Sequence, residues 1–107
     1  MTTEYGQARF LRCIGEPTRL RILKLLTEGE KCVCEIVEDL GREQSLVSHH
    51  LSALRACNIV TARQEAQKVF YRLSSPGLVR LVLGIESVMT ELPPCCGERS
   101  RRGRPQD

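Results

Sequence analysis

Cysteine is the residue type with the most reactive side chain in this sequence, and four of the six cysteines lie in close pairs. Cys32 and Cys34 form a C-x-C motif, Cys95 and Cys96 are adjacent, and Cys57 stands alone. Thiolates close together bind soft ions, and paired thiols oxidise to a disulfide. The sequence therefore predicts metal or redox chemistry at cysteine.

The cellular compartment decides whether these thiols are free. No segment has the eighteen or so uninterrupted apolar residues of a membrane span, and the amino terminus, MTTEYGQARF, lacks the apolar stretch of a signal peptide. We therefore expect a cytoplasmic protein without a membrane partner. Free thiols are the expected state of cysteine in that compartment, rather than a disulfide framework.

The cysteine spacings do not favour an enzyme. A redox enzyme would need a C-x-x-C motif, a hydrolase a nucleophile with its base, and a nucleotide enzyme a glycine-rich phosphate loop. The chain offers C-x-C and CC instead. Cys13 lies within an apolar helical pattern, where a packing role is expected. The sequence thus indicates a binding protein.

Helices and one hairpin must position these thiols. We expect helices over residues 3–13, 17–29, 33–40, 44–57 and 76–92, from the 3.6-residue apolar period, Pro17, a left-handed cap at Gly41 and a cap at Ser75. Residues 59–65 and 68–73 are β-rich and flank Ala66 and Gln67, as in a hairpin. The two short helices before the hairpin indicate a helix-turn-helix followed by a wing.

The last helix is apolar on more than one face. Leu78, Val82 and Ile85 lie on one stripe, whereas Leu83 and Val88 lie off it. Burial of all of them needs the core and a second surface, which we interpret as a homodimer interface; the alternative is a fully buried helix in a monomer. We expect a domain over residues 1–94 and a flexible Cys/Arg tail over 95–107.

The polar face of the fourth helix is suited to DNA. An α-helix fits the major groove, where glutamine pairs with adenine and serine donates or accepts hydrogen bonds. Net charge adds little, because the tail carries four arginines and leaves only +1 for residues 1–96. The expected base-reading residues are Gln44, Ser45, Ser48 and His49.

The wing offers a second set of DNA contacts. Arg63, Gln64 and Lys68 flank the hairpin turn, where cations reach phosphate or the minor groove. The expected DNA face therefore joins the fourth helix to the hairpin.

Several segments, in order and spacing, resemble the ArsR/SmtB family of metal-responsive repressors. They are EPTRLRILKLL, CVCEIVEDLG, QSLVSHHLSALRACNIV and KVFYRL, within residues 10–73. The resemblance implies a mainly α winged helix-turn-helix homodimer, paired through its first and last helices, on double-stranded operator DNA with an expected inverted repeat. It also places the family's structural histidine at His50. The sequence departs from these relatives at residues 65–67, where they commonly carry glycine.

The resemblance also assigns the cysteines. CVCE is similar to the arsenite, antimonite, cadmium or lead site of certain members, so Cys32 and Cys34 are the preferred ligands. Arsenite-responsive relatives carry a further cysteine where this chain has Val37. A rival or second site joins Cys57, a ligand position in cadmium- and lead-responsive relatives, to the tail pair Cys95 and Cys96.

The inducer follows from the ligand type. All-sulfur ligation favours As(III), Sb(III), Cd(II) or Pb(II), with zinc left open, and no cofactor is needed for DNA binding. Helical residues i and i+2 lie about 200° apart, so Cys32 and Cys34 meet only where the first turn unwinds or never forms. Ion capture is thus expected to distort that helix and release DNA. The alternatives are a thiol-redox-responsive repressor of the same fold and an architectural protein with structural thiols.

Overall fold

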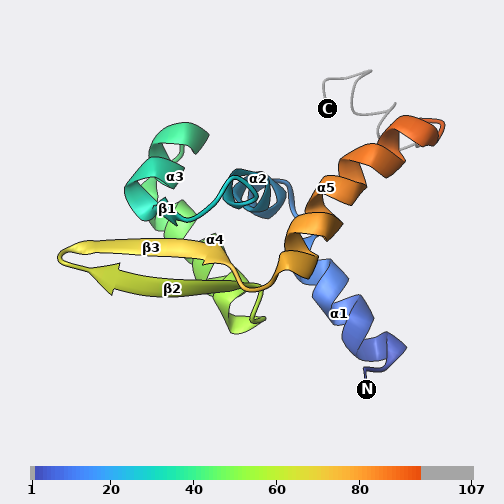
Figure 1. Ribbon diagram of the computed structural model, residues 1–107, viewed down its shortest axis with the longest axis horizontal. Coiled ribbons are helices and arrows are strands. Elements are labelled where there is room, and N and C mark those ends of the chain that lie inside the picture. Colours follow the sequence, from blue (N-terminus) through green and yellow to red (C-terminus); the bar gives the residue numbers. More distant parts are fainter. Residues whose placement is uncertain (1, 95–107) are drawn as a thin grey trace.

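The computed structural model describes residues 2–94 and shows a mainly helical domain with a small antiparallel sheet (Figure 1). The elements in chain order are α1 (Glu4–Ile14), α2 (Pro17–Leu26), β1 (Lys31–Cys32), α3 (Val33–Leu40), α4 (Gln44–Ala56), β2 (Val60–Glu65), β3 (Lys68–Leu73) and α5 (Pro76–Glu91). These bounds confirm the predicted order of helices, hairpin and final helix.

Local signals in the sequence set most of the helix ends. Pro17 is the first residue of α2, and the Glu16 carboxylate accepts a hydrogen bond from the Arg19 amide at 2.9 Å. Gly41 ends α3 in the left-handed region, at φ 64°. Two expectations were wrong in detail: α2 ends at Leu26, before Gly29, and the Ser75 side chain makes no capping hydrogen bond to α5.

The sheet has a strand that the sequence did not predict. Its order is β1-β3-β2, and β1 pairs with β3 through Lys31 opposite Tyr71 and Cys32 opposite Phe70. Two residues are too short to show an alternating pattern, so β1 left no signal. As a result, Cys32 belongs to the sheet that forms the wing.

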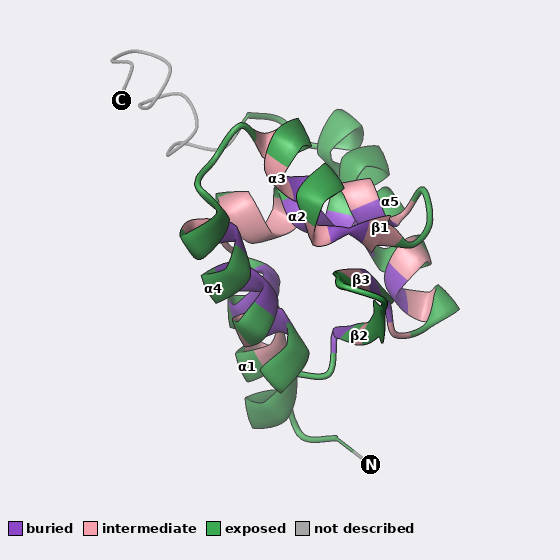
Figure 2. Ribbon diagram, turned by 90° about the vertical axis from the view of Figure 1, so that its left-hand side faces the viewer, coloured by how far each residue is buried: buried purple, intermediate pink, exposed green. Residues whose placement is uncertain are grey.

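One hydrophobic core lies under the helix-turn-helix, where α2, α3 and α4 meet the sheet (Figure 2). The side chains that are 0–1% exposed are Ile22, Leu23, Ile36, Val47, Leu51, Leu54, Ile59, Val60 and Val82. Because α4 contributes several of them, its opposite face is fixed in direction and turned to solvent.

The tip of the β2–β3 hairpin lies at one end of the molecule. The outer helices, α1 and α5, lie at the other end (Figure 1). In α5 only Leu78 and Val82 are buried, whereas Leu83 and the residue that follows the helix, Leu92, are each 56% exposed. The α5 helix therefore presents apolar side chains that the single chain does not cover. Within residues 2–94, none of the helices is long and apolar enough to cross a membrane.

Candidate DNA-binding face and thiol pairs

The exposed face of α4 carries the four residues predicted to read DNA. Gln44, Ser45, Ser48 and His49 are all exposed, and they occupy the first turns of the helix. The next turn of the same face continues with Ser52, which is also exposed. The structure thus brings the predicted base-reading residues together on one surface.

His50 lies on the other side of α4 and serves the fold. Its side chain is 8% exposed, and its Nδ1 accepts a hydrogen bond from Arg19 Nε at 3.1 Å. Burial lowers the pKa of His50, although the Glu16 carboxylate 3.8 Å away opposes this effect. The structural hydrogen bond expected for His50 is confirmed by this contact with Arg19.

In the wing, Arg63 is already paired with carboxylates. Its Nε and Nη2 each donate to Glu30 at 2.8 Å, and its Nη1 donates to Glu65 at 2.6 Å. The guanidinium also lies 4.8 Å from the centre of the Phe70 ring. These partners raise the pKa of Arg63 and lower that of Glu30. A phosphate would have to compete with two acidic partners for this cation.

Lys68 is the wing cation with the more open position. It is exposed at the start of β3, and the structure pairs it with no carboxylate among residues 2–94. Gln64 is exposed as well, with its amide 3.4 Å from the Ala66 carbonyl oxygen. Ala66 adopts a left-handed φ of 58°, the conformation that glycine would take more readily at this turn.

Cys32 and Cys34 lie together at the start of α3, joined by a disulfide. Cys32 is 5% exposed, whereas Cys34 is exposed. The Cys32 Sγ accepts a hydrogen bond from the Cys34 amide at 3.2 Å, and Glu35 Oε1 accepts one from the Cys32 amide at 2.8 Å. The pair therefore also caps the helix.

This geometry corrects the expectation that the two sulfurs meet only if the first turn of the helix is lost. Cys32 is not helical: with φ −70° and ψ 148° it is the extended residue before α3, which begins intact at Val33. The 200° separation applies only when both residues are helical. The sulfurs therefore come together without distorting α3.

The two cysteines line a groove of about 450 Å³ between the helix-turn-helix and the wing. From α4 the groove is lined by Gln44 and Ser48, and from the wing by Gln67, Lys68 and Val69. Three of the predicted DNA contacts thus share one groove with the predicted sensor. The sequence did not reveal this arrangement, because it depends on how the hairpin folds back over α3.

Val37 lines the same groove, at the position where arsenite-responsive relatives carry a further cysteine. The valine side chain has no atom that could bind a metal ion. Among the residues that the structure describes, histidine, cysteine and acidic side chains form no group of three or more that could hold a metal ion. Within that part of the chain, the site is a two-sulfur site.

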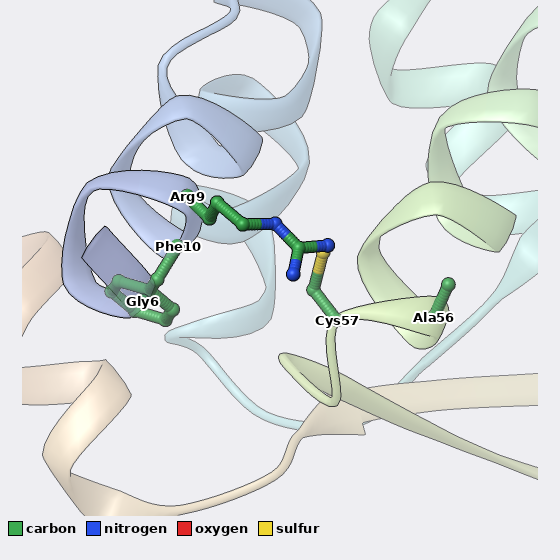
Figure 3. Close-up of a pocket in the computed structure, with 5 residues that line it drawn as sticks. All are labelled: Gly6, Arg9, Phe10, Ala56 and Cys57. Atoms are coloured by element: carbon green, nitrogen blue, oxygen red, sulfur yellow. The ribbon is translucent and has the colours of Figure 1, made fainter. Parts of the chain in front are cut away.

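Cys57 lies at the opposite end of α4 and is exposed, as the residue that caps the helix. It lines a pocket with Gly6, Arg9, Phe10 and Ala56, and Arg9 extends from α1 toward it (Figure 3). Cys13 is buried in the core, as predicted. Cys95 and Cys96 lie outside the described residues, so the rival site that they would form with Cys57 stays a prediction.

Comparisons with known proteins agree with this geometry. The family model described as "Bacterial regulatory protein, arsR family" matches residues 16–62, which include the helix-turn-helix. The transcriptional regulator CmtR of Mycobacterium tuberculosis is 38% identical over 104 residues, which cover 94% of this chain and 87% of CmtR. The chain belongs to the ArsR family.

Other relatives of this ArsR-family chain agree with its fold and its class. A probable mercury resistance operon repressor of Streptomyces lividans is 41% identical over 76 residues, covering 71% of this chain and 61% of the relative. A homodimeric winged helix-turn-helix DNA-binding domain of Mycobacterium bovis superimposes with a TM-score of 0.75 at 31% identity, covering 80% of each chain. The ArsR-family chain is thus a transcriptional repressor of the winged helix-turn-helix type and not an enzyme.

Proposed function

We propose that the chain represses transcription as a homodimer on operator DNA and releases the DNA when a soft ion binds the Cys32 and Cys34 thiolates. The groove shared by these sulfurs, Gln44, Ser48 and Lys68 is the observation that carries this proposal. An ion held there lies against both DNA-contacting elements, so its capture alters their relative position. Release does not require α3 to unwind.

The homodimer is supported by the uncovered apolar surface. Leu83 and Val88 of α5 are exposed, as is Leu92 just after it, and so are Tyr5 and Leu11 of α1. Covering them with a second copy removes this surface from water, which stabilises the pair. The M. bovis domain with the same fold is described as homodimeric. In such a dimer the two copies of α4 are related by a two-fold axis and would read an inverted repeat.

The inducer class follows from the donors. Two sulfurs without a nearby imidazole favour thiophilic species, of which As(III), Sb(III), Cd(II) and Pb(II) are the proposed inducers. The S. lividans relative is named for mercury resistance, which is consistent with a soft ion. Because Val37 supplies no ligand, a third donor for a three-coordinate ion must come from outside residues 2–94 or from a second copy.

Thiol oxidation is the second candidate, and one observation favours it: the Cys32 and Cys34 sulfurs are bonded in this structure. Hydrogen peroxide would oxidise the two thiols to this disulfide, with both thiol protons leaving in the two water molecules formed. The same groove would then report oxidation rather than an ion.

Fluorescence anisotropy on the chain's own promoter DNA tests both candidates. Under reducing conditions, we expect arsenite, antimonite, cadmium or lead to release the DNA from the wild-type protein but not from Cys32→Ser/Cys34→Ser. A matched variant, Cys95→Ser/Cys96→Ser, should keep the response if a second copy supplies the third donor, and a lost response would assign that donor to the tail. Release by peroxide alone would favour the redox candidate, and a full ion response in the first variant would refute the preferred site.

A further inference from the structure

An ion pair joins the wing to the segment that leads into the thiol pair. Glu30 lies between α2 and β1, two residues before Cys32, whereas Arg63 lies in β2. Both carboxylate oxygens of Glu30 accept hydrogen bonds at 2.8 Å, one from Arg63 Nε and the other from Nη2. Such a two-pronged contact fixes the relative orientation of the two groups as well as their distance. We refer to the Glu30–Arg63 pair as the wing clasp.

The wing clasp crosses the central strand of the sheet. The strand order is β1-β3-β2, so β3 separates β1 from β2. Neighbouring strands lie about 4.8 Å apart, which places the backbone of the β1 side about 10 Å from β2. Two long side chains that meet end to end, as glutamate and arginine do, are needed to close that distance.

Phe70 is the residue of β3 that the wing clasp contacts. In the register of the sheet, Phe70 is paired with Arg63 on β2 and with Cys32 on β1. The Arg63 guanidinium lies 4.8 Å from the centre of the Phe70 ring, within range of a cation–π interaction. Arg63 thus contacts the β3 partner of Cys32 and, through Glu30, the segment just before Cys32.

The backbone pairing between the wing and the thiol segment is short. β1 pairs with β3 through Lys31 and Cys32 alone, whereas the β2–β3 hairpin extends well beyond this pairing (Figure 1). Side-chain pairs across strands contribute to the stability of a sheet alongside the backbone hydrogen bonds. A side-chain contact that spans all three strands therefore matters most where the backbone ladder is this short.

We propose that Glu30 is a positioning residue, which through Arg63 fixes the wing relative to Cys32 and transmits a change at the thiol pair to the wing. In this role Arg63 holds the wing rather than a DNA phosphate. The transmission rests on the proposed function and deepens it, because the wing clasp is then a contact through which the thiol pair and the DNA-binding face are coupled.

Hydrogen–deuterium exchange of the reduced full chain tests the positioning without DNA or an ion. In Glu30→Gln, the amides of residues 31–32 and 70–71 should exchange about two- to fivefold faster, the range expected on loss of an exposed ion pair. Arg63→Lys should have the same effect, because lysine keeps the charge but loses the two-pronged contact. Glu65→Gln is the matched control, since it removes an Arg63 partner that lies within β2 itself.

Operator anisotropy with the same variants tests the transmission. The measured quantity is the ratio of the operator Kd with and without arsenite, antimonite, cadmium or lead. A general effect of charge on DNA binding enters both values and cancels in the ratio. Glu30→Gln should lower this ratio by about threefold or more. Arg63→Lys should lower it as much, the double variant no further, and Glu65→Gln not at all, because Glu30 and Arg63 form one contact.

The outcomes separate the wing clasp from the proposed function. Unchanged exchange in both clasp variants would overturn the proposal, and so would a wild-type ratio in both. Additive losses in the double variant would show that Glu30 does not act through Arg63, which also overturns it. If none of the ions changes the operator affinity of the wild-type protein, the proposed function fails, whereas faster exchange in both variants would still support Glu30 as the residue that positions the wing.

Discussion

The two ends of α4 differ in what they contact. Its amino end carries exposed Gln44 and Ser48 beside the wing, in the groove that contains Cys32 and Cys34. Its carboxyl end carries Cys57 against α1, one of the two outer helices. Under the proposed function, a thiol reaction at the first end would act directly on the proposed DNA-reading surface, whereas one at the second end would act on the packing of α4 against α1. The two ends of α4 therefore differ in what a change at a cysteine would disturb.

The largest expected effect comes from the buried middle of α4, which joins the two ends. Leu51 is 1% exposed within the core, so Leu51→Ala should lower the free energy of unfolding by about 2–5 kcal/mol. Urea unfolding followed by circular dichroism measures it. Ser52→Ala, at the exposed neighbouring position, is the control. A fall of less than about 1 kcal/mol in the free energy of unfolding of Leu51→Ala would show that the middle of α4 is not part of the core.

The next effect concerns the amino end alone. If Gln44 reads a base, Gln44→Ala should weaken operator binding by about 1–3 kcal/mol and leave unfolding unchanged. Ser52→Ala, further along the same face of α4, should have the smaller effect in the same anisotropy assay. Equal losses in the two variants would contradict the assignment of base reading to the first turns.

In the wing, the structure distinguishes two cations that the sequence treats alike. Lys68→Ala should reduce the slope of the logarithm of the operator-binding constant against the logarithm of the salt concentration by about one. Arg63→Ala should change this slope less, because Arg63 is already paired with Glu30 and Glu65. Anisotropy titrations at several salt concentrations measure the two slopes. A larger change in Arg63→Ala would mean that DNA displaces its acidic partners.

The smallest effect concerns His50, between the two ends. Burial lowers its pKa in the folded chain below the ordinary value near 6.5, so the unfolded chain binds the proton more readily. Stability should therefore be complete above the unfolded pKa and should fall as the pH drops through it toward the folded pKa. Thermal unfolding between pH 7 and 5 measures this: His50→Gln should flatten the profile, and exposed His49→Gln should not.

Much of the fold could be predicted because local signals agreed with the packing. Pro17, Gly41 and the apolar period located helices, and the hairpin was evident around Ala66. The polar face of α4 was predictable as well, since Val47 and Leu51 point its other face into the core. These features depend on neighbours within a few residues.

The features that could not be predicted are contacts between distant segments. The β1 strand is too short for a pattern, and its pairing with β3 is what places Cys32 beside the wing. Glu30 and Arg63 also lie far apart in sequence, and spacing alone does not indicate this pair. The sequence thus identified the cysteines as chemically important, while the structure showed which elements lie beside them.

The hydrogen bond from the Cys34 amide to Cys32 Sγ has an evolutionary consequence. Cys32 is the N-cap residue of α3, and its sulfur accepts the capping hydrogen bond. Serine is a better N-cap residue than cysteine. A Cys32→Ser substitution should therefore remove a proposed sensing ligand while preserving or improving the start of α3. In terms of the proposed function, one substitution separates an inducible repressor from a stable repressor that no longer responds.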